Sequence, residues 1–193
     1  NSEEWNGSSW SEGNNLNTAR YGNQGGGSQT SAITWSGTTD GGSTFTTASE
    51  EYNGTSWTEG NNTNTGVYKS AGAGTSELAL KFGGQDTTAT ESYDGTSWTV
   101  VNSLNTARAD SGGAGTQTLA IAISGNLIPV AGPKTELWNG TNWSESPATI
   151  GTARASAGAA GSQTSGLYAG GTVNGSTALT NTEEFTTVQD VPS

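Results

Sequence analysis

The sequence contains no cysteine and no histidine, and these two absences exclude several kinds of chemistry. Without cysteine there is neither a disulfide framework nor a thiolate nucleophile. Zinc and copper sites depend on histidine and cysteine, and catalytic triads of the serine-protease kind depend on histidine. We therefore expect no metal, no cofactor and no enzyme activity.

Basic residues are scarce, with six lysines and arginines against seventeen acidic residues and a net charge of −11. They are scattered along the chain and form no patch that could hold a phosphate backbone, so nucleic acid is excluded as a partner. The longest apolar run, near residues 119–123, is far too short to span a bilayer. We accordingly expect no membrane insertion.

Hydrophobic residues are also few, at 30%, whereas glycine is abundant, at 30 of 193 residues. Such a composition favours disorder. Two observations oppose that interpretation: charged residues make up only 12%, and the seven tryptophans, five tyrosines and three phenylalanines recur at regular intervals. Regular spacing of large aromatic residues indicates a core built from repeats.

An aromatic hairpin motif occurs four times, followed by a partial fifth copy. The first aromatic residues of the copies, at positions 5, 52, 93, 138 and 185, lie 41 to 47 residues apart. This period fits a four-stranded propeller blade and is too long for a leucine-rich repeat. The Asn-Gly or Asp-Gly pair predicts a two-residue type I′ turn, with Trp5 opposite Ser8. The copies are WNGSSW (5–10), YNGTSW (52–57), YDGTSW (93–98), WNGTNW (138–143) and TEEF (182–185).

Each hairpin is followed by three further segments of the repeat: an NTAR-like segment, a strand of small residues, and an apolar strand that ends near glycine. Small residues allow the close approach that crowded inner strands of a propeller need. The small-residue strands are expected within 24–30, 72–77, 112–118 and 158–164, and the apolar strands within 32–37, 78–84, 119–125 and 166–171.

This order of segments resembles the kelch repeat, with its glycine pair, its spaced tyrosine and tryptophan, and the basic residue that closes the unit. The glycine pair is intact in 83–84 and 170–171, while Ser-Gly replaces it in 36–37 and 124–125, and Val67 replaces the basic residue. The resemblance covers nearly the whole chain and implies an all-β, four-bladed β-propeller of four-stranded repeats. The NGTSW and NTAR phrases are also similar in style to tail-fibre and other virion-surface repeat proteins of bacteriophages.

We expect one domain over residues 1–193, with repeats at approximately 17–63, 64–104, 105–150, and 151–193 plus 1–16. Residues 1–16 are predicted to pair with 155–173 and close the ring, because an open array leaves strand edges unpaired. Residues 3–5 and 183–185 fit the same strand, and we expect the N-terminal copy to occupy it. The alternatives are an open β-solenoid and an arc of a larger ring completed by other subunits.

Three recurring sets of side chains have both a functional and a structural interpretation. Tryptophans could stack on sugars or pack between blades. Arginines could grip an acidic ligand or bond the neighbouring blade, and glutamates could ring a cation or stay solvated. Recurrence at one repeat position favours the structural interpretation. The sets are Trp10, Trp57, Trp98 and Trp143; Arg20, Arg108 and Arg154; and Glu3, Glu4, Glu50, Glu51, Glu91, Glu136, Glu183 and Glu184.

Function is expected in the loops that differ between repeats, at 37–49, 85–90, 125–134 and 172–181, because binding residues concentrate on loops held by a rigid scaffold. The sequence favours a non-enzymatic surface binding or adhesion module, extracellular or on a virion, that recognises a glycan or protein receptor. The alternatives are a structural spacer or decoration of a larger assembly, and a glycan hydrolase. The candidate contact residues are Asp40, Phe45, Asp86, Asn126, Lys134 and Asn174.

The repeated tryptophan gives a first testable prediction. Replacing Trp98 with alanine should destabilise the domain by about 3–5 kcal/mol, the usual cost of deleting a buried tryptophan. Chemical denaturation of the wild type and the variant measures this difference. An unchanged free energy of unfolding would mean that the side chain is exposed and would favour the sugar-platform interpretation.

Overall fold

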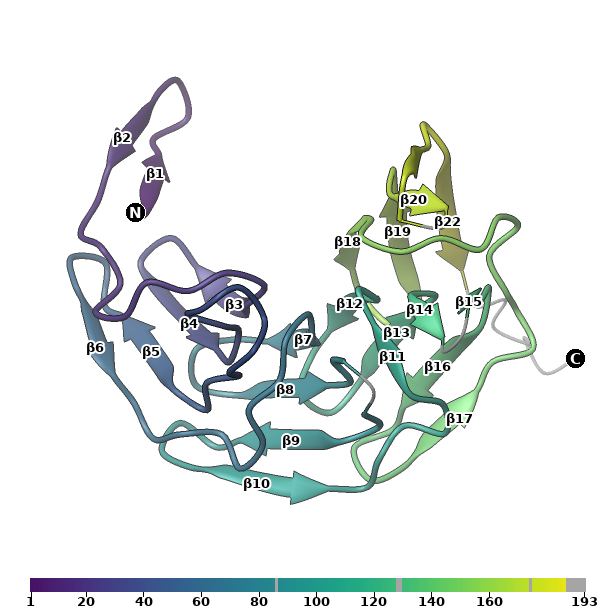
Figure 1. Cartoon of the computed structure of the whole chain (residues 1–193), viewed down its shortest axis with the longest axis horizontal. Helices are drawn as coiled ribbons and strands as arrows, with labels where there is room; N and C mark the ends of the chain where they lie inside the picture. The colour runs from purple at the N-terminus through teal and green to yellow at the C-terminus, as the bar shows by residue number, and fades with distance from the viewer. Residues whose placement is uncertain (86, 128–129, 174, 187–193) are drawn as a thin grey trace, which may run out of the picture.

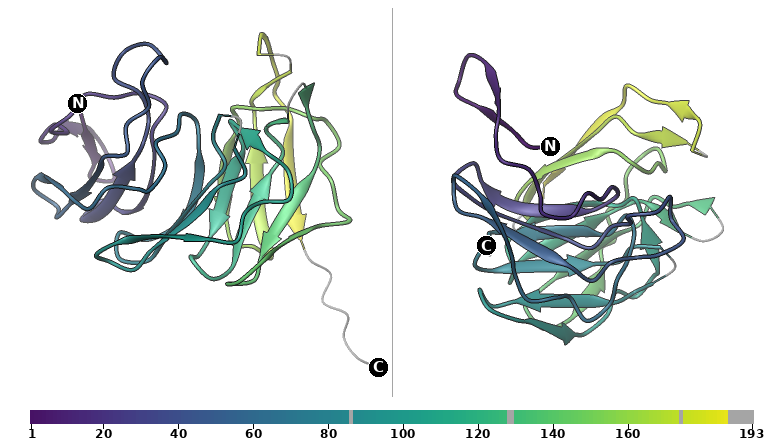
Figure 2. Two further views of the ribbon diagram at one scale, coloured as in Figure 1. Left: turned by 60° about the horizontal axis from the view of Figure 1, so that its bottom comes forward. Right: turned by 60° about the vertical axis from the view of Figure 1, so that its left-hand side comes forward.

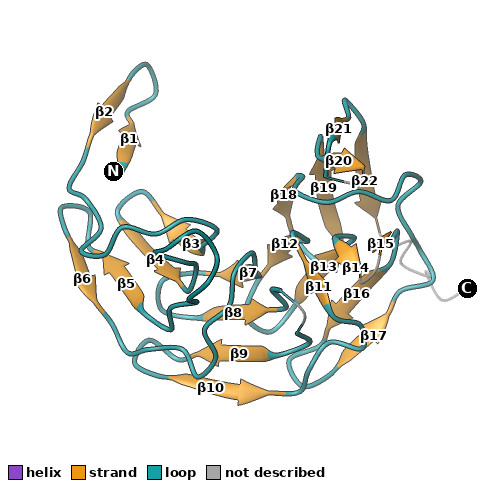
Figure 3. Ribbon diagram, in the orientation of Figure 1, coloured by secondary structure: helices purple, strands orange, loops and turns teal. Residues whose placement is uncertain are grey.

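A computed structural model of the chain describes residues 1–85, 87–127, 130–173 and 175–186. In these residues every regular element is a β-strand, and no helix suited to crossing a membrane is found there. The sheets stand side by side around a common axis in an arc that is open on one side (Figures 1 and 3). The prediction of an all-β propeller with four blades is confirmed.

Three blades are complete four-stranded antiparallel sheets. In each, the small-residue strand lies innermost, against the inner strands of its neighbours, and the strand that begins with the hairpin tryptophan lies outermost. Their strands are β3 (Gln24–Ser28), β4 (Ser31–Trp35), β5 (Ser49–Tyr52) and β6 (Trp57–Glu59); β7 (Ala71–Gly74), β8 (Ala79–Phe82), β9 (Thr90–Tyr93) and β10 (Trp98–Val101); and β12 (Gly112–Gly115), β13 (Ala120–Ile123), β16 (Thr135–Trp138) and β17 (Trp143–Glu145).

The two ends of the arc are incomplete. Among the described residues the fourth blade has three strands, β18 (Gly158–Gly161), β19 (Ser165–Ala169) and β22 (Thr182–Thr186), and a lone hairpin precedes the first blade, β1 (Glu3–Trp5) with β2 (Trp10–Glu12). Short strands pair within the loops: β11 (Arg108–Ala109), β14 (Asn126–Leu127) and β15 (Val130–Ala131) form one small sheet, and β20 (Thr172–Val173) and β21 (Thr177–Ala178) form another.

Closure of the ring by the chain ends, predicted from the sequence, is wrong for this structure. β1 pairs with β2, and β19 pairs with β22 over five residue pairs from Ser165↔Thr186 to Ala169↔Thr182. The C-terminal copy of the acidic-aromatic strand therefore holds the place expected for the N-terminal copy. It is the local copy, which follows β19 after residues 170–181, whereas the hairpin of β1 and β2 stands at the opposite end of the arc (Figures 1 and 2).

The hairpin turns also differ from the predicted type I′ geometry. Trp5 lies directly opposite Trp10, so the loop contains four residues rather than two, and the same register recurs in the other three hairpins. The Asn6 side chain accepts hydrogen bonds from the amides of Ser8 and Ser9, at 3.0 and 2.9 Å. This side-chain turn requires a positive φ only at Gly7. The two tryptophan rings remain in contact, with centroids 5.5 Å apart.

Adjacent blades fit a large side chain of one blade against a small residue of the next. Trp35 of the first blade covers Gly72 of the second, where a Cβ atom would overlap the indole ring. Phe82 of the second blade covers Gly113 of the third, where a Cβ atom would lie 3.0 Å from the phenyl ring. Glycine in the inner strands therefore allows the blades to approach each other.

The outer-strand tryptophan of the following blade completes each of these contacts. Ring centroids lie 5.3 Å apart for Trp35 and Trp98 and 4.8 Å apart for Phe82 and Trp143. Trp98 and Trp143 are each 6% exposed, which confirms the structural interpretation for these two residues. Trp10, at the open end of the arc, is 65% exposed.

A buried glutamate ties each complete blade together at the start of its third strand. Glu50, Glu91 and Glu136 are all 0% exposed, so the expectation of solvated acids is wrong for them. The Glu50 carboxylate accepts hydrogen bonds from the backbone amides of Asn17 and Thr18 and forms an ion pair with Arg20. Burial alone would raise the pKa of Glu50, but these donors outweigh it and hold that pKa below its ordinary value.

The second blade keeps this ion pair although Val67 replaces the arginine. Lys81 on β8 reaches the Glu91 carboxylate at 2.7 Å, and both side chains are almost completely buried. In the third blade Arg108 makes the equivalent bond to Glu136 at 2.6 Å. The arginines therefore bind a carboxylate of their own blade, not of the neighbouring blade, and their role is structural.

This exchange of partners predicts a rescue. Lys81→Met should cost about 3–5 kcal/mol, because it leaves the Glu91 carboxylate buried without a cation. Adding Val67→Arg should recover part of that loss, because position 67 corresponds to Arg20 and Arg108 in the other blades. Chemical denaturation measures both effects, and the exposed Lys134–Glu145 pair supplies the control: Lys134→Met should cost at most about 1 kcal/mol. Equal losses for the two lysine variants would contradict the assignment.

Candidate functional site

In each blade, the residue two positions before the first residue of the inner strand has a left-handed backbone. Four equivalent residues share this conformation, Gly22, Lys69, Asp110 and Ser156, with φ of 63°, 60°, 53° and 56°. A positive φ is uncommon for residues other than glycine, and such strain persists where the surrounding structure enforces it. Because strained residues gather at functional sites, the end of the axis where these four residues lie is a candidate site.

A series of backbone hydrogen bonds links these four residues around the axis. The amide of Lys69 donates to the carbonyl of Gly22 at 2.8 Å, that of Asp110 to Lys69 at 3.1 Å, and that of Ser156 to Asp110 at 2.9 Å. Each bond joins one blade to the next. The series therefore fixes the four left-handed residues in space and holds their side chains around the axis.

A polar cavity of about 410 Å³ opens at this end of the axis, and we call it the axis pocket. All four repeats contribute to it through the segments before and at the start of their inner strands. Its lining residues are Gly22, Asn23, Gln24, Lys69, Ser70, Asp110, Ser111, Gly112, Gly113, Ser156, Ala157, Gly158 and Ala159.

An ion pair crosses the lining of the axis pocket. Lys69 Nζ lies 2.8 Å from Asp110 Oδ2, and the Asn126 side-chain amide donates to the same oxygen at 3.2 Å. Burial lowers the pKa of Lys69, but the hydrogen bond and charge of Asp110 outweigh it and leave that pKa above its ordinary value. The pair therefore offers a cation and a carboxylate side by side, with little net charge.

Two buried hydroxyl groups in the axis pocket lack a protein partner. Oγ of Ser70 and Oγ of Ser111 are buried and form no hydrogen bond with the described residues. Ser70 is 8% exposed, and the two serines hold the same position in consecutive repeats. A buried hydroxyl without a partner costs about 1–3 kcal/mol. Both oxygen atoms are shielded from solvent in this structure, so a ligand in the cavity would reach them only after the serine side chains rotate.

Aromatic rings lie beside the axis pocket. Tyr21 and Tyr68 occupy equivalent repeat positions next to the left-handed residues, and their ring centroids are 5.7 Å apart in an edge-to-face arrangement. Phe45 stacks on Tyr68 at 6.2 Å, and Lys69 Nζ lies 5.1 Å from the centre of the Tyr68 ring. Tyr21 is 46% exposed. This cluster offers a partly exposed aromatic surface next to the polar cavity.

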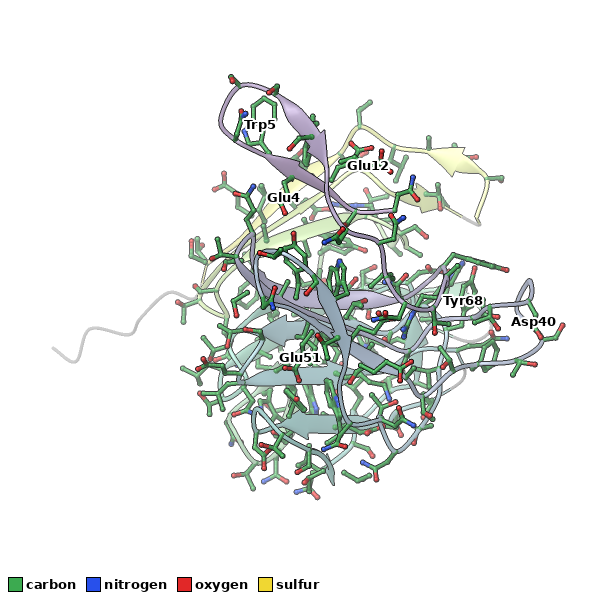
Figure 4. The ribbon with its side chains drawn as sticks, turned by 90° about the vertical axis from the view of Figure 1, so that its left-hand side faces the viewer. Glu4, Trp5, Glu12, Asp40, Glu51 and Tyr68 are labelled. Atoms are coloured by element: carbon green, nitrogen blue, oxygen red, sulfur yellow. The ribbon has the colours of Figure 1, made fainter. Side chains whose placement is uncertain are left out.

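The loops predicted to carry function lie at the same end of the axis as this pocket. Backbone bridges Tyr21↔Thr38 and Ala155↔Thr172 and the pairing of β11 with β14 join the bases of three loops to the segments that line it. In Figure 4 the loop that carries Asp40 projects on the same side as Tyr68. The predicted face and the axis pocket therefore coincide.

The four predicted contact residues that the structure describes are not gathered in one place. Asn126 touches the axis pocket through Asp110, and Phe45 belongs to the aromatic cluster. Asp40 closes its own loop, where hydrogen bonds from Thr44 help to hold its pKa at about 2. Lys134 forms an exposed ion pair with Glu145 at 2.8 Å. Asp86 and Asn174 lie outside the described residues.

Sequence reasoning did not identify the central residues of this site, which are Tyr21, Tyr68, Lys69, Ser70, Asp110 and Ser111. A signal for them exists. The three residues that follow the repeat's basic position read YGN, YKS, ADS and ASA in the four repeats, so they differ strongly between otherwise similar segments. These three-residue segments are short and adjoin the small-residue strand, so their variation is a weaker signal than that of the longer loops.

The described residues contain no group of three or more acidic side chains that could hold a metal ion. The buried glutamates are each saturated by an arginine or lysine and by backbone amides, as Glu136 is by Arg108, Asn105 and Thr106. Fold and site together define a β-propeller with a polar, ligand-sized pocket at its axis.

Comparison with known proteins agrees on the fold. No protein-family model and no curated protein sequence matches the chain. Solved structures do match, among them that of YjhT, a propeller protein, with a TM-score of 0.78 and 15% sequence identity. The match covers 95% of this chain and 71% of YjhT. At this identity the likeness shows the fold alone.

A stability measurement distinguishes a ligand-binding role for the two serines from a structural one. Ser70→Ala and Ser111→Ala should leave the free energy of unfolding unchanged or raise it by about 1 kcal/mol, because each removes a buried hydroxyl without a partner. Chemical denaturation provides the measurement, with Thr90→Ala as the control. That variant removes the acceptor of the Trp143 indole and should destabilise the fold. Destabilisation by the serine variants would show that these hydroxyls support the fold.

Proposed function

We propose that this protein is a non-enzymatic binding module that takes a glycan in the axis pocket. The observation that carries the proposal is the polar axis pocket, in which Lys69 and Asp110 place a cation and a carboxylate 2.8 Å apart. A sugar presents neighbouring hydroxyl groups that donate and accept hydrogen bonds at once. It can therefore bond the carboxylate of Asp110 and the ammonium of Lys69, and rotation of the serine side chains would bring the hydroxyls of Ser70 and Ser111 to it as well.

The shape and surroundings of the pocket support a ligand of this size. Its volume of about 410 Å³ lies in the range of small-molecule sites, which is roughly 300–1,000 Å³. Tyr21, next to Gly22 of the lining, is 46% exposed, and the apolar face of a sugar ring can pack on such an aromatic side chain. The four left-handed residues hold these groups before the ligand arrives, which lowers the entropy cost of binding.

We place this activity outside the cell or on the surface of a virion. Support comes from the net charge of −11, the scarcity of basic residues and the repeat style shared with virion-surface proteins. A kelch-type relationship is part of the same proposal, and it rests on the order of strands and the glycine and arginine positions within the repeat.

Binding to a broad glycan array, followed by calorimetry on the best sugar, tests the function. Ser70→Ala and Ser111→Ala should each weaken binding about tenfold, the effect of one lost hydrogen bond of ~1.4 kcal/mol. Lys134→Ala serves as the control on the outer loops and should bind as the wild type does. Absence of binding across the array would overturn the proposal in favour of a spacer. Loss of binding in the Lys134 variant alone would place the ligand on the loops.

A further inference from the structure

The lone hairpin of β1 and β2 sits in the register of a blade that precedes the first one. The Tyr52 hydroxyl donates to Glu4, as the Tyr93 hydroxyl donates to Glu51 one blade further on. Trp57 Nε1 donates to Ser2 Oγ at 3.4 Å, as Trp143 Nε1 donates to Thr90 Oγ1 at 3.0 Å. The hairpin therefore has the register of the outer half of a blade, and no inner strand lies beside it among the described residues.

Polar and aromatic side chains of this two-stranded hairpin are exposed to solvent. Trp5 and Trp10 are 44% and 65% exposed, whereas Trp138 and Trp143, at the same positions of the third blade, are 2% and 6% exposed. Glu3 is exposed, although it corresponds to the buried Glu136. Figure 4 shows the hairpin projecting from the first blade, with Trp5 near its tip.

At the other end of the arc there is an unfilled cavity rather than an exposed tryptophan. A cavity of about 140 Å³ lies between the third and fourth blades, lined in part by Ile123, Thr135, Tyr168 and Phe185. Ile123 and Thr135 correspond to Phe82 and Thr90, which hold Trp143 between the preceding two blades. Among the described residues, the fourth blade has no outer strand, so no side chain of that blade takes the position that Trp143 holds in the third.

We propose that a second copy of this chain donates its β1–β2 hairpin to the fourth blade. In this arrangement β1 takes the place of β22 beside β19, and Trp10 enters the cavity formed by Ile123 and Thr135. The exchange is between similar strands, since Glu3-Glu4-Trp5 replaces Glu183-Glu184-Phe185. The joined chains continue the blade order from the fourth blade of one copy to the first blade of the next.

The ion pair of the fourth blade is the easiest one to exchange. Arg154 binds Glu183, but the Glu183 side chain is 28% exposed, whereas those of Glu50, Glu91 and Glu136 are at most 1% exposed. Glu3 of the incoming hairpin corresponds to Glu183 and brings its carboxylate to Arg154. The outer strand would then cover this pair as it covers the pairs in the complete blades.

A second copy is favoured over the chain's own hairpin as the donor. The hairpin is held against the first blade, where Asn14 Nδ2 donates to the carbonyl of Thr55 at 2.6 Å, and it lies far from β18 in Figures 1 and 2.

The hydrogen-bond series around the axis ends with the amide of Gly22 on one side and the carbonyl of Ser156 on the other. These two groups complement each other across an end-to-end junction. Such a head-to-tail contact closes into a ring or continues as a filament.

Sedimentation equilibrium over a range of concentrations tests this proposal with three forms of the protein. The wild type should associate reversibly. Trp10→Ala should weaken association by roughly thirtyfold or more, the effect of deleting a buried tryptophan anchor at an interface. The double variant Leu167→Cys, Glu184→Cys joins opposed residues of β19 and β22 and should be monomeric when oxidised and associate again when reduced. The chain has no other cysteine to interfere.

A mixture gives the sharpest control, because the two defects lie at opposite ends of the arc. Trp10→Ala keeps an intact fourth blade and the oxidised double-cysteine form keeps an intact hairpin, so the two together should form dimers that neither forms alone. Thermal melts verify that both variants are folded. A wild type that stays monomeric, a monomer whose hairpin crosslinks to its own β19, or association that persists in both variants would each overturn the proposal.

Discussion

The buried carboxylate at the start of the third strand is the interaction on which each complete blade depends. It binds the two amides of the incoming linker and one cation, and so fixes the linker before the chain turns into the inner strand. A buried carboxylate without these partners would be strongly unfavourable. The second blade shows that the charge matters more than its source, since Lys81 supplies it from β8 where Val67 cannot.

Once the linkers are fixed, the axis pocket follows from the backbone. The left-handed residues come after the linker's basic position, and their mutual hydrogen bonds arrange four short segments in a row around the axis. The residue types of those segments differ between the repeats, whereas the surrounding strands have similar residues in each repeat. The scaffold therefore presents a polar surface of free composition, in which Lys69, Asp110 and the two serines face the same cavity.

The same regularity explains the ends of the arc. Each of the two contacts between complete blades uses a large residue of one blade, a small residue of the next and an outer tryptophan. Where one of these parts has no counterpart, either a tryptophan is exposed or a cavity remains. Trp10 and the cavity beside Ile123 are these two cases. A repeat protein has no terminal surface of its own unless a capping repeat supplies one, and joining end to end is another solution to that constraint.

The sequence by itself determined the strands, their order within a blade and the inward place of the small residues, because these follow from local patterns such as the Asn-Gly turns and the recurring tryptophans. Through loop variation it also indicated the end of the axis at which the axis pocket lies. Only the tertiary structure decided the partner of β19, the four-residue hairpin register and the convergence of Lys69 with Asp110. The hairpin register depends on whether the Asn6 side chain accepts the turn amides, which the Asn-Gly pair alone does not decide. The other two depend on distances between segments about one repeat apart or on competition between similar strands, and a pattern along one chain carries no information about which competitor prevails.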